Sequence, residues 1–114
     1  MTAFRLISLP THAAIELLAG FALMALPLVL GASVAGSAAA FIAGAILVGV
    51  AFGKAVESVP VRRQHDTDWG IVFGLLGAAL VLGIGGEPIA MLVFTGAAVV
   101  QLSLNLVTRY SLAY

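Results

Sequence analysis

Apolar residues fill four long segments of the chain, and short runs of turn-forming or polar residues separate them. The segments cover residues 12–30, 38–56, 69–84 and 88–108. A helix needs about 20 mostly apolar residues to cross the hydrocarbon core of a bilayer. The pattern therefore predicts an all-α protein with four transmembrane helices, which together form one integral membrane domain over residues 1–114.

The connections between these segments indicate how the helices pair. Small residues fill the first connection, around residues 31–37, and Gly-Gly-Glu at 85–87 followed by Pro88 predicts a tight third turn. Short connections of this kind make consecutive helices antiparallel neighbours. The middle connection, residues 57–68, is longer and strongly polar. We therefore expect a four-helix bundle made of two hairpins that are joined by a polar loop.

Several residues near the ends of the segments predict where helices begin and end. Ser8 or Thr11 can cap the first helix, because a hydroxyl oxygen there accepts a hydrogen bond from a backbone N–H. Pro27 is expected to kink that helix or end it early, and Gly31 marks its stop. Asp-Thr-Asp at 66–68 is expected to cap the third helix.

Small residues recur at helical spacing within the segments. On the second helix they stand four residues apart, so they share one face. Small faces let two helix backbones approach closely, and this is a main source of packing energy in lipid. The residues expected to mediate helix packing are Gly20, Ala45, Gly49, Gly53, Gly70, Gly74, Gly77 and Gly96.

Composition excludes several classes of protein. Apolar residues make up 62% of the chain and charged residues 9%, which leaves no room for a water-soluble domain. The net charge is zero, so the sequence does not predict nucleic-acid binding. The chain has no cysteine, and the motifs of soluble enzymes are absent. We therefore expect no catalytic residues.

The basic residues predict an orientation. With four spans, the two termini and the middle loop share one side of the membrane, and all five basic residues fall on that side. By the positive-inside rule that side is cytoplasmic. The residues assigned to topology, and to contact with anionic lipid, are Arg5, Lys54, Arg62 and Arg63, with Arg109 at the end of the fourth helix.

Glu16 is the one acidic residue inside the first segment, and a carboxylate in lipid needs a partner, a proton or a way to water. Three alternatives follow: it reaches the cytoplasmic headgroups, it is paired within the protein, or it exchanges a proton or cation. His12 stands one helical turn earlier and can hydrogen-bond to it. The other histidine, His65, is expected in the polar loop, so the sequence predicts neither a metal site nor a cofactor.

A polar stripe on the fourth helix is a candidate partner for this pair. Gln101, Asn105 and Arg109 recur every four residues and share one helix face. Polar residues in membrane helices usually face other helices. We expect the stripe to face Glu16 across the bundle, and the alternative is a stripe that faces a partner protein.

The first helix also carries a resemblance to a known family. The pattern His12-x3-Glu16-x3-Gly20, followed by Pro27, Leu30-Gly31 and a glycine-bearing second helix, resembles the small bacterial membrane proteins built from SPW repeats. The end of the chain, Leu106 to Ser111, is similar to that of four-helix actinobacterial proteins of unknown function. This sequence has Leu26-Pro27-Leu28 where the repeat has Ser-Pro-Trp. The resemblance implies a multi-pass protein of the bacterial inner membrane, with no implied chemistry.

The two hairpins also show weak internal similarity, as such repeats would. His12 and Gly20 match His65 and Gly74 at an offset of about 53 residues, and Gly44 matches Gly96. Two copies of a hairpin would form a parallel repeat, because an even number of spans returns the chain to the same side. Duplication and chance glycine matches both remain open at this point.

A second resemblance concerns function. Chain length, four helices and a glutamate in the first helix resemble the small multidrug resistance transporters, and residues 97–109 resemble the fourth helix of that family. The aromatic residues that line the family's substrate chamber are missing from the second and third helices.

We therefore expect a non-catalytic accessory or structural subunit, whose partners are lipid and either other membrane subunits or further copies of itself. The alternative is a minimal proton-coupled transporter that acts as a dimer, with Glu16 as the coupling carboxylate.

Overall fold

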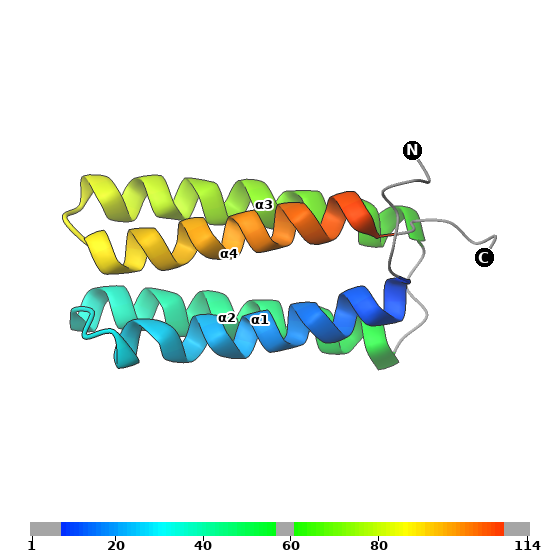
Figure 1. Ribbon diagram of the computed structural model, residues 1–114, viewed down its shortest axis with the longest axis horizontal. Coiled ribbons are helices and arrows are strands. Elements are labelled where there is room, and N and C mark those ends of the chain that lie inside the picture. Colours follow the sequence, from blue (N-terminus) through cyan, green and yellow to red (C-terminus); the bar gives the residue numbers. More distant parts are fainter. Residues whose placement is uncertain (1–7, 57–60, 109–114) are drawn as a thin grey trace.

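A computed structural model describes residues 8–56 and 61–108 and places them in four helices (Figure 1). This confirms the predicted all-α, four-helix architecture for the described residues, and all four helices are long and apolar enough to be candidate membrane spans. Their bounds are α1 Leu9–Val29, α2 Val34–Val56, α3 Val61–Ile84 and α4 Pro88–Val107.

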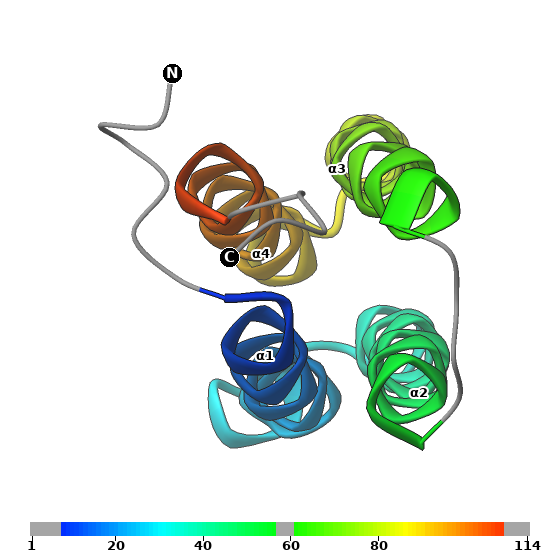
Figure 2. The ribbon, with the colours of Figure 1, turned by 90° about the vertical axis from the view of Figure 1, so that its right-hand side faces the viewer.

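The helices form two antiparallel hairpins that lie side by side. Viewed along the bundle, they occupy the corners of a square in which α1 lies beside both α2 and α4 (Figure 2). The closest packing is within the hairpins, α1 with α2 and α3 with α4, and the main contact between the hairpins is that of α1 with α4. The beginning of α1 and the end of α4 lie at the same end of the bundle (Figure 1).

The start of α1 and the two tight turns follow the predicted signals. The hydroxyl oxygen of Ser8 accepts a hydrogen bond from the backbone N–H of Thr11, so Ser8 is the cap of α1. Pro27 lies inside α1, which ends two residues later at Val29. Gly31 and Gly86 have φ angles of 81° and 80°, a left-handed backbone that glycine adopts without steric cost. Both turns therefore depend on glycine.

Three helices begin earlier than predicted, and the first begins at Leu9, not at 12. The third was expected from residue 69, but α3 begins at Val61, so residues 61–68 are helical and Asp-Thr-Asp at 66–68 lies inside the helix instead of capping it. The polar composition of residues 61–68 suggested a loop. A helix can, however, continue through polar residues where it extends beyond the membrane. The second helix begins at Val34, not at 38, because the small residues after it include alanine, a strong helix former. Residues 57–60 lie outside the described part of the chain.

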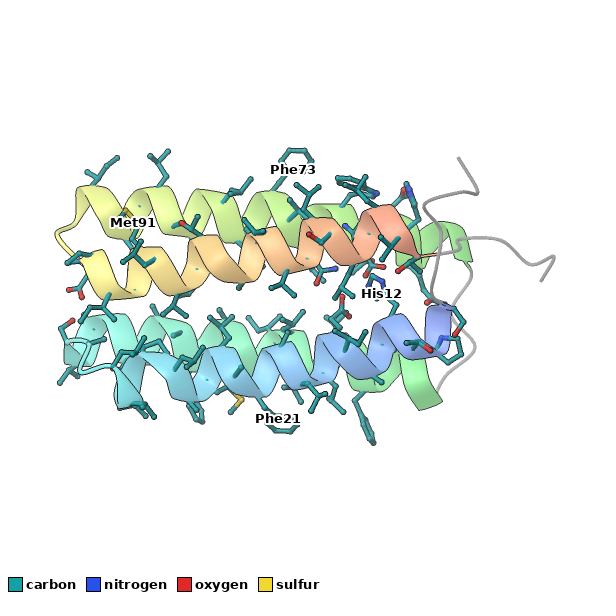
Figure 3. All side chains as sticks on the ribbon, viewed as in Figure 1. His12, Phe21, Phe73 and Met91 are labelled. Atoms are coloured by element: carbon teal, nitrogen blue, oxygen red, sulfur yellow. The ribbon has the colours of Figure 1, made fainter. Side chains whose placement is uncertain are left out.

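Apart from Phe94, the apolar interior of the bundle is made of small and medium side chains, and many larger apolar side chains point outward. Phe21 and Phe73 project from opposite sides of the bundle (Figure 3) and are 51% and 69% exposed. This distribution suits a protein surrounded by lipid, where outward apolar side chains meet hydrocarbon. The buried core consists of Leu23, Ala40, Leu75, Ala79, Phe94 and Ala98.

The first hairpin is closed by a direct contact between glycines. A Cβ atom built at Gly20 would lie 3.1 Å from the carbonyl oxygen of Gly44, and one at Gly44 would lie 2.6 Å from the carbonyl oxygen of Gly20. Real Cβ atoms essentially never come within 3.0 Å of another atom, and a contact of 3.1 Å is already unusually tight. Glycine at both positions therefore allows α1 and α2 to pack at short range.

The contact between the two hairpins is less complete. An open apolar groove of about 570 Å³ runs between α1 and α4, and Leu18, Ala22 and Gly96 are among the residues that line it. A smaller pocket of about 230 Å³ lies between α2 and α3, lined in part by Leu47 and Gly74. At the end of the bundle where the two turns lie, the Ser33 hydroxyl donates a hydrogen bond to the Glu87 carboxylate. Polar contacts thus supplement incomplete apolar packing between the hairpins.

Candidate functional site

Buried polar side chains from three helices gather near the end of the bundle where α1 begins. His12 points from α1 into the space between the hairpins (Figure 3). Each residue of this group is 2% exposed or less. We call it the polar cluster, and it consists of His12, Glu16, Asp68, Gln101, Asn105 and Thr108.

His12 lies at the centre of the contacts. Its Nε2 atom is 3.3 Å from a carboxylate oxygen of Glu16, one turn later on α1, and 3.2 Å from a carboxylate oxygen of Asp68 on α3. Its Nδ1 atom is 2.6 Å from the hydroxyl oxygen of Thr108, the residue that follows α4. One imidazole ring therefore links the two hairpins through three helices.

The hydrogen bonds of Thr108 indicate that Nδ1 of His12 carries a proton. The Thr108 hydroxyl donates its only proton to the carbonyl oxygen of Leu104, one turn earlier on α4. Its oxygen must then accept from His12, so Nδ1 is protonated and donates. The Nε2 atom is left facing the two carboxylates.

The rest of the cluster follows α4. The Gln101 side-chain amide donates a hydrogen bond of 2.9 Å to the side-chain oxygen of Asn105. Gln101, Asn105 and Thr108 recur at spacings of four and three residues, so they share one face of α4. Because buried polar groups in a membrane require internal partners, this face is directed into the bundle and not at lipid.

Part of the site predicted from the sequence is present in the structure. The His12–Glu16 pair is present, and Glu16, at 0% exposure, is paired inside the protein and does not reach outward to the headgroups. Gln101 and Asn105 of the predicted stripe are buried, and Thr108, on the same face of α4, contacts His12 on α1; that the stripe faces Glu16 stays a prediction. Arg109 lies outside the described residues.

Sequence reasoning missed Asp68. It was assigned to the middle loop as a helix cap, whereas it lies two turns inside α3 and is fully buried. His65 also lies on α3, but its ring is 44% exposed and accepts a hydrogen bond from the Trp69 indole N–H. Once the start of α3 is known, Asp68 can be identified as one of the acidic residues that a membrane-spanning helix must pair.

The predicted packing residues divide into two groups. Gly20 packs within the chain, as described above. A Cβ atom built at five others would meet no atom within 4 Å, namely Gly49, Gly70, Gly74, Gly77 and Gly96. Ala45 is exposed, and Gly53 is partly exposed. Most of the small faces are therefore not used for packing inside one chain.

The predicted topology residues fall in two parts of the chain. Lys54 belongs to the last turn of α2, and Arg62 and Arg63 belong to the first turn of α3. Arg5 lies outside the described residues.

The chemistry of the polar cluster is limited by its burial. His12, Glu16 and Asp68 are each at most 1% exposed, so no substrate reaches them in this conformation. Three such groups can hold a proton or a cation between them. Comparison of the chain with protein-family models, with curated proteins and with solved structures finds no match.

Proposed function

We propose that this chain is a non-catalytic subunit that packs its small outward faces against other transmembrane helices, either those of a larger membrane complex or those of further copies of itself. The observation that carries the proposal is the placement of its glycines. Glycine inside a helix costs about 1 kcal/mol relative to alanine. At five glycines a Cβ atom would meet no atom within 4 Å, so close packing inside this chain does not compensate for that cost.

In a lipid bilayer, helices associate mainly through faces made of small residues. Apolar surface alone does not drive association in a bilayer, because lipid tails are as apolar as leucine. Close approach of two helix backbones at small residues does favour their association. Gly96 and Gly74 line the two open spaces between the hairpins, and Gly49 with Ala45 forms a small face on α2. These are three places where a helix from outside can pack.

Substitution of these glycines tests the proposal. Gly96→Leu, Gly74→Leu and Gly49→Leu each add a large side chain where a Cβ meets no atom, so the fold should tolerate them. At least one should reduce the size of the assembly on native gels, or remove a co-purifying subunit, without lowering the melting temperature. Ala25→Leu, an exposed position on α1 that lines neither space, is the matched control and should leave assembly unchanged.

Two outcomes would contradict this function. One is an assembly that keeps its size in all three variants. The other is an isolated protein that carries proton-linked flux in vesicles and loses it in Glu16→Gln, which would favour the transporter alternative.

We further propose that the end of the bundle holding the polar cluster faces the cytoplasm of a bacterial cell. The basic residues support this orientation, because Lys54, Arg62 and Arg63 belong to that end of the helices, whereas the turn that contains Glu87 has no Lys or Arg. A single cysteine at position 87 should react with a membrane-impermeant thiol reagent added outside spheroplasts, and protection of that cysteine would reverse the assignment.

The internal repeat also remains a proposal. Each hairpin has a histidine near the start of its first helix that contacts the residue four positions later, His12 with Glu16 and His65 with Trp69. The close glycine contact of the first hairpin has no counterpart at Gly74 and Gly96. Related sequences in which the two hairpins align with each other would support duplication, and related sequences with no such similarity would oppose it.

A further inference from the structure

The structure places three potential metal ligands at one point between the hairpins. They are the Nε2 atom of His12, a carboxylate oxygen of Glu16 and a carboxylate oxygen of Asp68, and all lie within 4.8 Å of one another. We propose that these three residues bind one divalent transition-metal ion, with zinc as the representative case. This site is independent of the proposed assembly through glycine faces.

The distances around Nε2 are compatible with a shared metal ion. In a tetrahedral zinc site with metal–ligand bonds of about 2.0–2.2 Å, neighbouring ligand atoms are about 3.3–3.6 Å apart. The two distances from Nε2 to carboxylate oxygens are 3.3 and 3.2 Å. Charge-assisted hydrogen bonds are usually shorter, at about 2.7–2.9 Å, and one N–H shared by two carboxylates is well aligned with neither.

The remaining edge of the site, between the two carboxylates, is no longer than 4.8 Å. Rotation of a carboxylate about its side-chain bonds can adjust this distance to the separation of ligands around a zinc ion. Both carboxylates extend from helices, so the donor atoms have rigid supports on α1 and α3.

The hydrogen bonds of His12 already select the nitrogen that a metal needs. Nδ1 donates to Thr108, whose hydroxyl donates in turn to the Leu104 carbonyl. Histidines that bind metals commonly donate their other ring N–H to a nearby acceptor, which fixes the ring and its tautomer. Thr108 is therefore a positioning residue, and it turns Nε2 toward the carboxylates, where a metal ion can take the place of a proton on that nitrogen.

The ligand types indicate the class of metal. One imidazole with two carboxylates suits borderline ions such as Zn²⁺, Co²⁺, Fe²⁺ and Mn²⁺, whereas Ca²⁺ and Mg²⁺ prefer oxygen ligands alone. Because the ligands come from both hairpins, the ion would hold α1 against α3, which have little direct contact of their own. The role we assign to the ion is that of a clamp between the hairpins.

Cobalt provides a direct test, because tetrahedral Co²⁺ in a protein site has visible absorption bands. Tag-free protein in mild detergent is stripped with a chelator and titrated with Co²⁺. We expect saturation at one ion per chain, and displacement by Zn²⁺. Glu16→Gln and Asp68→Asn should each weaken binding at least tenfold, and Thr108→Val should weaken it by about 10- to 100-fold through loss of positioning.

Matched controls separate this site from adventitious binding. Asp66→Asn makes the same chemical change two residues from Asp68, on a side chain that is 75% exposed, and His65→Gln removes the other histidine. Both should leave the cobalt spectrum and affinity unchanged. Wild-type protein without saturable cobalt bands would overturn the proposal even if some variants fail to fold, and so would equal loss of binding in Asp66→Asn.

Discussion

At the scale of single residues, His12 explains how two carboxylates can be buried among apolar helices. Its ring contacts Glu16, Asp68 and Thr108, which belong to three different parts of the chain. Removing one partner of a buried ionic group costs about 3–5 kcal/mol, because the remaining charge keeps its desolvation cost. The stability of the cluster therefore depends on the histidine.

Replacement of this histidine should be strongly destabilising. His12→Leu leaves Glu16 and Asp68 near each other without the ring between them, so we expect a loss of about 3–5 kcal/mol in unfolding free energy. The same change at His65, whose ring is partly exposed, should cost much less. Thermal unfolding in detergent measures both. Equal melting temperatures for the two variants would show that the cluster does not hold the bundle together.

The position of each cluster residue along the chain explains why some members of the cluster could be predicted from the sequence and others could not. The His12–Glu16 pair is local, so helical spacing alone predicts it. Asp68 could not be assigned, because its role depends on where α3 begins and on which side of that helix faces α1. Thr108 was overlooked because a threonine near a helix end has no distinctive signal of its own.

At the scale of helices, glycine backbones of the first hairpin contact each other directly, and the described glycines of α3 and α4 make no such contact. The apolar segments themselves predicted all four helices, since length and hydropathy are sufficient for membrane spans. Small residues at four-residue spacing predicted faces that favour packing. They could not predict which faces are used inside the chain, because that depends on the rotation of each helix.

Two glycines on α2 should respond in opposite ways to the same substitution. Gly44→Ala places a Cβ within 2.6 Å of the Gly20 carbonyl oxygen, so the helices must separate and we expect a loss of about 1–3 kcal/mol. Gly49→Ala meets no atom within 4 Å and should be neutral, or stabilising by up to about 1 kcal/mol. Melting curves of the two variants provide the comparison, and similar destabilisation in both would contradict the glycine contact between α1 and α2.

At the scale of the whole molecule, polar groups join the hairpins near both ends of the bundle, and apolar contact between them is incomplete. The polar cluster lies near one end and the Ser33–Glu87 hydrogen bond lies at the other. Open spaces remain on the two sides between them. A bundle of this kind has a small interior of its own, so further helices would add buried surface that one chain lacks.

Native mass spectrometry of the protein extracted from its own membrane tests this central claim most directly. One chain has a mass of 11.6 kDa. We predict a particle that contains further protein, either additional copies or other subunits, and that loses it when the glycine faces are blocked. A protein extracted under the mildest conditions as a single 11.6 kDa chain, with nothing else bound to it, would contradict the proposed role.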